Sequence, residues 1–229
     1  MTDERQNFEG NAEEQARARE IANDFLVSLF GEGLTEEELQ QATEAIADEL
    51  GKEIAVFDAS DDEILEMLAD IGLETDRDEF VRLVESCVDE GELLYALCEK
   101  TGVRFEEEDE NFGLAYTAIG ELWSRWRPDE PSFSLVLDAI ADGYNCKPHE
   151  WADTLAAWQE AWEGLPRAVR LLGKEILDDT EAIVDGHSIS SWLTDYRTTL
   201  AYAAERDDDY KADLFLFDAD LKELREQPK

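Results

Sequence analysis

The sequence predicts an all-α protein built from antiparallel helical hairpins. Several segments begin with a cap residue followed three positions later by an acid, and apolar residues then recur every three or four positions. Glycines stand where these runs stop, as at the ends of helices. In the second half of the chain, tryptophans recur at intervals of 35 and 34 residues, which indicates a helical repeat.

Two helices are expected between residues 11 and 51. The first begins at the cap residue Asn11 and ends at Gly31, and its inner face is expected to consist of Ile21, Phe25 and Leu29. The second begins at a capping box on Thr35 and stops at Gly51. The apolar run 54–57 that follows is ambiguous, because it is also compatible with a short strand.

Three further helices are expected before the middle of the chain. A capping box on Ser60 begins a helix that ends at Gly72. Thr75 is expected to cap the next helix, which ends near Gly91 and has the inner face Phe80, Val84, Cys87 and Val88. A shorter helix is expected over residues 93–100.

The second half is expected to contain three helical hairpins. Trp123, Trp158 and Trp192 are each followed by another aromatic residue three or four positions later. The expected pairs are 108–127 with 133–143, 148–163 with 166–178, and 190–206 with 208–226. Such hairpins stack because one pair alone cannot bury its apolar face. Chance spacing in an aromatic-rich segment is the alternative explanation.

The segments LWSRWRP (122–128), AWQEAW (157–162) and WLTDY (192–196) resemble the tetratricopeptide-like helical region of prokaryotic proteins that often carry a SEC-C zinc motif. The resemblance covers residues 108–226 and implies an array of hairpins that binds other proteins. The cysteine-rich zinc motif of that family is absent from this sequence, so its metal does not carry over. We therefore expect no cofactor and no metal site.

A shift in composition predicts two domains, over residues 1–105 and 106–229. The acidic run 106–110 marks the boundary. Acids exceed bases by 27 through residue 110 and by 12 after it, and all six tryptophans lie in the second part. The first domain is therefore expected to be an acidic helical domain and the second a Trp-rich, repeat-like one.

The charge of the chain indicates the solvent in which it works. Against 59 Asp and Glu residues stand 20 Lys and Arg residues, a formal net charge of -39 on 229 residues. Salt relieves such self-repulsion, so the composition favours a halophilic archaeal protein whose acidic surface is screened by solvent cations. An acidic mesophilic protein is the alternative. Hydrophobic residues make up 43% of the chain, which argues against disorder.

The sequence favours a cytoplasmic protein that contacts neither membrane nor nucleic acid. Runs without a charged residue, such as 112–120 and 186–194, are far shorter than the ~20 residues that span a bilayer. The acidic N-terminus lacks the basic start and apolar core of a signal peptide. Direct binding of nucleic acid is not expected, because phosphate contacts need a basic surface.

Histidines and cysteines offer weak candidates for chemistry. His149 and Asp153 are four residues apart, a spacing that can hold a metal on one helical face, although so acidic a chain produces this spacing by chance. His187 follows Gly186 in an expected turn, and no catalytic partner is evident. Cys87 and Cys98 are expected in the core, and Cys146 is expected in an exposed turn.

One cluster of cations runs against the acidic background and defines the predicted partner-binding site. Arg167, Arg170 and Lys174 are spaced to share one helical face. The expected site for an anionic ligand or acidic peptide consists of these three with Arg125, Arg127, Trp158 and Trp162. In the alternative, the cations pair with neighbouring acids such as Glu163, Asp178 or Asp179, and the tryptophans form a core stripe.

The sequence thus favours a non-catalytic cytoplasmic adaptor or helper that binds another protein through its second half. Two alternatives stay open. One is a maturation chaperone for redox enzymes, which the segment 16–30 resembles although the later motifs of those chaperones are absent. The other, from a different class, is a metal-dependent hydrolase that uses His149 and Asp153.

Overall fold

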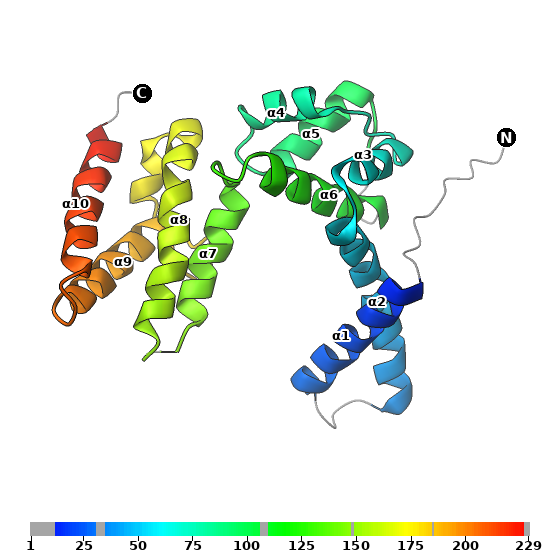
Figure 1. Ribbon diagram of the computed structural model, residues 1–229, viewed down its shortest axis with the longest axis horizontal. Coiled ribbons are helices and arrows are strands. Elements are labelled where there is room, and N and C mark those ends of the chain that lie inside the picture. Colours follow the sequence, from blue (N-terminus) through cyan, green and yellow to red (C-terminus); the bar gives the residue numbers. More distant parts are fainter. Residues whose placement is uncertain (1–11, 31–34, 106–109, 148, 185, 227–229) are drawn as a thin grey trace. The chain divides into compact units, whose positions relative to one another are not determined.

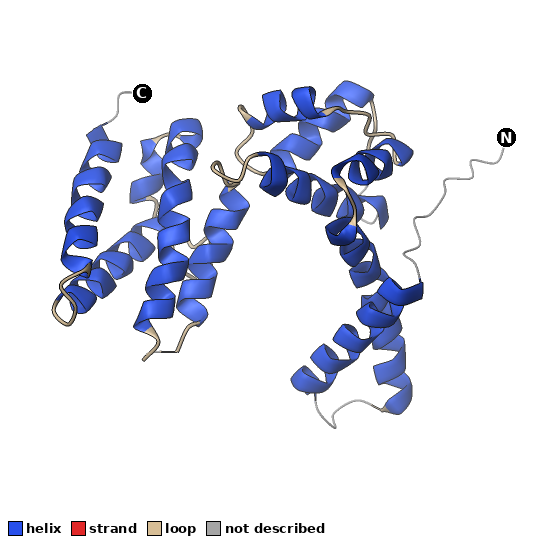
Figure 2. Cartoon of the chain, viewed as in Figure 1, coloured by secondary structure: helices blue, strands red, loops and turns tan. Residues whose placement is uncertain are grey.

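The computed structural model describes residues 12–30, 35–105, 110–147, 149–184 and 186–226 (Figure 1). These residues form ten α-helices and one 3₁₀-helix, and their sole β-type pairing is a bridge between Val184 and His187. Figure 2 shows the helices and the loops that join them. The all-α prediction is confirmed. No helix in the described ranges has the length and apolar character needed to cross a membrane.

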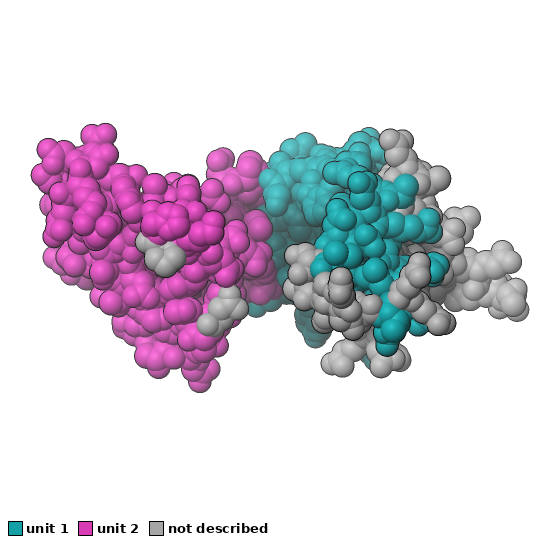
Figure 3. All heavy atoms as spheres, turned by 90° about the horizontal axis from the view of Figure 1, so that it is seen from below, with its two compact units in different colours: residues 1–85, 90–126 teal, residues 86–89, 127–229 magenta. Residues whose placement is uncertain are grey.

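The chain forms two compact units (Figure 3). Unit 1 comprises residues 1–85 and 90–126, and unit 2 comprises residues 86–89 and 127–229. This division differs from the one expected at residues 105 and 106. The helix that follows the acidic run packs on the helices before it, so the change in composition does not coincide with the change in packing.

Unit 1 contains α1 (Ala12–Phe30), α2 (Glu36–Asp58), α3 (Asp61–Asp70), α4 (Arg77–Val84), α5 (Glu90–Thr101) and α6 (Glu110–Trp126). The last of these is its central helix, because it contacts α2, α3, α4 and α5. Its buried side chains are Leu114, Ala115, Ala118, Ile119, Leu122, Trp123 and Trp126. The first predicted hairpin paired this helix with 133–143, and its two members belong to different units.

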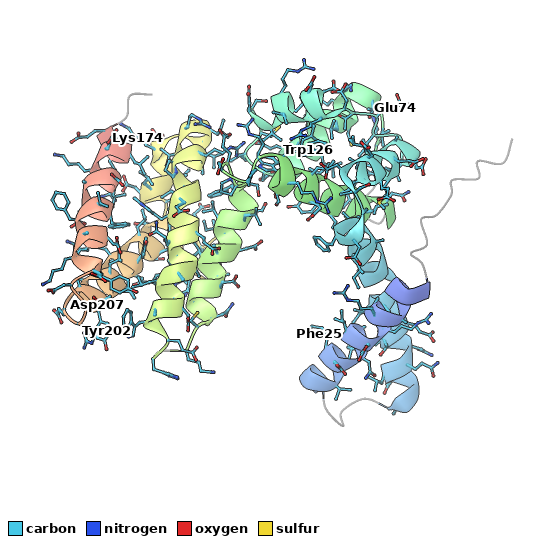
Figure 4. The ribbon with its side chains drawn as sticks, viewed as in Figure 1. Phe25, Glu74, Trp126, Lys174, Tyr202 and Asp207 are labelled. Carbon is cyan, nitrogen blue, oxygen red and sulfur yellow. The ribbon has the colours of Figure 1, made fainter. Side chains whose placement is uncertain are left out.

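The α1–α2 pair buries a different face of α1 from the one expected. Ala18, Ala22 and Ala47 pack together between the two helices. Ile21 and Phe25 are 44% and 54% exposed, so their assignment to the inner face is wrong. Figure 4 labels Phe25 on α1. Alanines let the helices approach closely, and that approach selects the small-residue face over the bulky one. The expected cap Asn11 and stop Gly31 lie outside the described residues.

Helix α2 does not stop at Gly51. It continues through this buried glycine to Asp58 and includes residues 54–57, so the strand alternative is excluded. A Cβ at Gly51 would lie 4.0 Å from that of Ala18, which shows how closely α1 passes. Packing against α1 offsets the roughly 1 kcal/mol that a glycine costs inside a helix.

The capping boxes predicted at Thr35 and Ser60 are both present. In each, the hydroxyl accepts from the backbone N–H three residues on, and the glutamate there accepts from the cap residue's N–H. The cap of α4 is Asp76 instead of Thr75: its carboxylate accepts from the Glu79 N–H at 2.9 Å. This helix ends at Val84, so Cys87 and Val88 lie in the loop beyond it, buried as expected but not helical.

Unit 2 contains α7 (Phe133–Asn145), α8 (Trp151–Leu172), the 3₁₀-helix η2 (Lys174–Asp178), α9 (Ile189–Ala204) and α10 (Tyr210–Glu226). Helix α7 packs on α8, α9 packs on α10, and η2 contacts α8, α9 and α10. The last predicted hairpin matches α9 and α10. The hairpin of 148–163 with 166–178 is wrong, because α8 continues through Pro166. Leu155, Trp158, Leu165 and Val169 are buried on both sides of the proline, and this shared apolar face holds the helix together.

Tyr196 lies at the centre of the aromatic core of unit 2. Its ring is stacked on Trp192 with centroids 6.0 Å apart, and it meets the rings of Trp158, Trp162 and Phe217 at 6.1, 6.4 and 5.1 Å. The hydroxyl donates to Gln159 Oε1 at 2.7 Å. Burial raises the pKa of Tyr196, so the phenol stays neutral. Each such ring pair contributes about 0.5–1.5 kcal/mol beyond its area.

We predict that Gly143→Ala destabilises unit 2 by about 2–4 kcal/mol. The Trp158 indole donates to the Ile140 carbonyl at 3.1 Å and occupies the space that a Cβ at Gly143 would need. Gly113→Ala in α6 is the matched control, since a Cβ there meets nothing within 4 Å, and it should stabilise by about 0.5–1 kcal/mol. Urea unfolding followed by circular dichroism checks both. Equal stability of the two variants would contradict this packing.

Candidate functional site

Arg125, one of the expected partner-binding residues, makes its contacts inside unit 1. Its guanidinium donates to Glu121 at 2.7 Å and Asp61 at 3.1 Å. It also donates to the backbone carbonyls of Phe57 and Ala59, at 3.1 and 2.7 Å. Carbonyls at the end of a helix lack intrahelical donors, so Arg125 caps α2 from α6.

Asp61, the first residue of α3, accepts hydrogen bonds from both Arg125 and Trp126. Trp126 Nε1 donates to its second carboxylate oxygen at 2.6 Å. The hydrogen bond from Trp126, followed by that from Arg125, holds the pKa of Asp61 below its usual value, against a smaller effect of burial. Together these groups hold the ends of α2, α3 and α6 in one place.

Arg167 is only 5% exposed and anchors a loop to α8 inside unit 2. It donates to the carbonyl of Cys87 at 2.7 Å and to that of Val88 at 3.4 Å. The carboxylate of Glu130 lies 3.6 Å from its Nε and 2.6 Å from Arg127 Nη2. Burial lowers the pKa of the Arg167 guanidinium, and Glu130 counteracts that effect. The prediction that Arg167 is an accessible cation is therefore wrong, because its side chain is buried and holds the loop to α8.

The remaining expected site residues do not form one surface. Trp158 and Trp162 are 4% and 9% exposed and belong to the core stripe that was the alternative. Arg170 is exposed on α8, whereas Lys174 lies beyond the helix, after Gly173 with φ of +95°. The Lys174 ammonium donates to the Arg225 carbonyl at 3.2 Å. Because Arg125 lies in unit 1 and the other members in unit 2, the predicted site is not assembled within either unit.

His149 and Asp153 do not share a helical face. The imidazole precedes α8 with its side chain 78% exposed, 3.7 Å from the carboxylate of Glu150, which is the N-cap. Within the described ranges, no group of three or more His, Cys, Asp or Glu side chains is placed to hold a metal ion. His187 instead stacks on Tyr144, with ring centroids 3.6 Å apart.

The three thiols differ in their surroundings. Cys87 is buried, as expected. Cys98 is half-buried, and burial raises the pKa of its thiol, which makes it a poor nucleophile. Cys146 is half-buried instead of exposed, and its Sγ donates to the Asp142 carbonyl at 3.3 Å.

A surface that sequence reasoning missed lies in unit 1. A hollow with a volume of about 730 Å³ is formed by α5, the loop after it and the start of α6. Gly102, with φ of +77°, ends α5 and turns the chain into that loop. We call this surface the aromatic hollow; its lining residues are Gly91, Leu94, Tyr95, Cys98, Glu99, Gly102, Val103, Arg104, Phe105 and Phe112.

The aromatic hollow keeps large apolar side chains in solvent. Tyr95 is 65% exposed and Phe112 is 43% exposed. Phe112 meets Phe105 edge to face at 6.4 Å and stacks on Tyr116 at 6.5 Å, while the Tyr95 hydroxyl donates to Glu99 at 3.1 Å. Unit 1 carries 35 acidic and 9 basic side chains, a formal charge of -26, so this apolar surface stands out. The signal in the sequence was the aromatic residues on either side of the acidic run 106–110.

Comparison with known proteins gives no match: no protein-family model, curated protein or solved structure is similar to this chain. The resemblance to SEC-C-associated tetratricopeptide-like proteins therefore stays a prediction. Function must be argued from the fold and from the surfaces described above.

We predict that Arg167→Ala lowers the free energy of unfolding by about 2–4 kcal/mol, because two buried carbonyls and Glu130 lose their donor. Arg167→Lys should recover only part of this, since an ammonium cannot reproduce the planar fork. Arg170→Ala, on the exposed side of the same helix, is the control and should change stability by less than about 0.5 kcal/mol. Denaturant unfolding checks the series, and equal effects at both arginines would refute it.

We predict a pH-dependent difference between the wild type and Asp61→Asn. A folded-state pKa below the unfolded one stabilises the fold above about pH 4, and this stabilisation is lost as pH falls through the folded-state value. The wild type should therefore be the more stable protein at neutral pH, and its advantage should shrink in acid. Unfolding curves measured from neutral to acidic pH check this, with Glu66→Gln on the exposed surface of α3 as control. A gap independent of pH would contradict it.

Proposed function

We propose that this protein is a non-catalytic adaptor that binds another protein through the aromatic hollow of unit 1, in a salt-rich cytosol. The observation that carries the proposal is the exposure of Tyr95 and Phe112 around an apolar hollow in a strongly acidic unit. An adaptor was also favoured by the sequence, but the binding surface now proposed is a different one.

The composition of the aromatic hollow supports a protein partner. Interface centres are enriched in aromatic residues and arginine and depleted in acids, and Tyr95, Phe105, Phe112 and Arg104 fit that pattern. Pockets for small molecules enclose most of the ligand surface. Two walls of this hollow, Tyr95 and Phe112, are themselves exposed, which suits a side chain that projects from another protein.

The charge of unit 1 suggests the chemistry of the bound segment. An apolar or aromatic anchor would fill the hollow, and flanking Lys or Arg residues would complement the formal charge of -26. Salt screens the flanking contacts but strengthens apolar burial, so the anchor would supply the affinity at high ionic strength. A maturation chaperone that holds an apolar segment of its client would use the same contacts.

We predict that short random peptides selected by display on the full chain in about 2 M KCl share an aromatic or leucine residue next to Lys or Arg. Tyr95→Ser and Phe112→Ser should each weaken their binding about tenfold or more, because each removes an exposed wall of the hollow. Fluorescence titration with the selected peptides measures the change.

Tyr202→Ser is the matched control for Tyr95→Ser, since Tyr202 is 46% exposed on α9 in unit 2. It should leave the affinity unchanged. Circular dichroism should show that all three variants stay folded, because the substituted side chains are exposed. Peptides that bind the Tyr95→Ser/Phe112→Ser double variant as tightly as the wild type would refute the proposed surface.

A further inference from the structure

Helix α10 has two apolar faces, and the core of unit 2 covers only one. The inner face packs on the core through Leu214, Phe217, Leu221 and Leu224. On the opposite side, Phe215 is 72% exposed and Leu216 is 55% exposed, the former being the most exposed large hydrophobic side chain in the described ranges. Within unit 2, helix α10 packs on α9 and η2, and Phe217 on its inner face meets Trp162 of α8 with ring centroids 4.6 Å apart.

The exposed apolar residues of α10 form one stripe. Ala212, Phe215, Leu216 and Ala219 follow the spacing of three, four and seven that places side chains on one helical face, and all four are exposed. We call these four residues the outer stripe. The same spacing marks the buried face of an amphipathic helix, which indicates that a further helix covers it.

The charges beside the outer stripe differ in sign on its two sides. At 100° per residue, Lys211 and Lys222 fall along one edge, 20° apart. Asp213 and Asp220 fall along the other edge, also 20° apart. All four side chains are exposed. Lys211 pairs with Asp208 and Lys222 with Glu226 at 3.9 Å, contacts that are weak at an exposed surface and can be exchanged for others.

We propose that the outer stripe pairs with the outer stripe of a second copy of this chain, with the two α10 helices parallel. In a parallel pair related by a two-fold axis, each edge of one helix faces the opposite edge of the other. The lysine edge of each copy then lies along the aspartate edge of its partner. An antiparallel pair would place lysine against lysine and aspartate against aspartate, so these four charges favour the parallel arrangement.

The small extent of the outer stripe points to a weak association. Its four residues span two turns of helix, about 10 Å, which is a small contact for a protein dimer. A weak dimer follows, with a dissociation constant of about 10–500 µM. The proposal does not depend on the aromatic hollow, which belongs to the other unit.

Sedimentation equilibrium of the full chain over this concentration range in about 2 M KCl tests the association. The wild type should dimerise reversibly, and Phe215→Ser should weaken the dimer at least about tenfold while leaving the circular dichroism unchanged. Phe25→Ser is the matched control, since Phe25 is 54% exposed on α1, and it should dimerise like the wild type. A wild type that stays monomeric throughout, or a Phe215→Ser variant that dimerises normally, would overturn the proposal.

Cysteine cross-linking tests the orientation in a Cys98→Ser/Cys146→Ser background, where the remaining native thiol, Cys87, is buried. In a parallel pair residue 212 meets its own counterpart, so Ala212→Cys alone should give a disulfide-linked dimer on mild oxidation. Asp218→Cys, outside the stripe, is the control and should not cross-link. Cross-linking that requires a mixture of Ala212→Cys with Ala219→Cys would indicate antiparallel helices and would overturn the parallel assignment.

Discussion

Arginine side chains that donate to backbone carbonyls are the interaction on which both units depend. Only 20 Lys and Arg residues accompany 59 acids, yet Arg125 and Arg167 donate to backbone carbonyls instead of serving the surface. One joins the end of α2 to α6, and the other joins the loop 86–89 to α8. A guanidinium spans such contacts because its planar fork carries five donors and never loses its charge.

With Arg125 and Arg167 engaged inside their units, exposed apolar side chains mark two parts of the acidic surface. The aromatic hollow combines Tyr95, Phe105 and Phe112 on unit 1, and the outer stripe centres on Phe215 and Leu216 on unit 2. Burial of apolar surface strengthens in the salt that screens the carboxylates. Association through apolar anchors is therefore the mode of binding that this composition permits best.

The sequence predicted the helical class and the capping boxes at Thr35 and Ser60 because those signals are local. It failed where packing overrides a local signal, at Gly51 and Pro166, both of which lie inside continuous helices. The prediction that Arg167 is an accessible cation failed for a related reason. Arg167 donates to the carbonyls of Val88 and Cys87, which are 79 and 80 residues away along the chain. No sequence pattern around position 167 predicts that contact. The aromatic hollow likewise forms where α5, the loop after it and the start of α6 pack together, and no local pattern predicts that packing.

Nitrogen-15 NMR of the arginine side chains tests most directly whether Arg125 and Arg167 are internal hydrogen-bond donors. The Nε–H groups of Arg125 and Arg167 should exchange slowly with water and show hindered rotation of the guanidinium, since both are held by several acceptors. The exposed Arg170 should exchange fast. Fast exchange at Arg125 and Arg167, equal to that of Arg170, would contradict their role as internal donors and would make them candidates for a binding surface again.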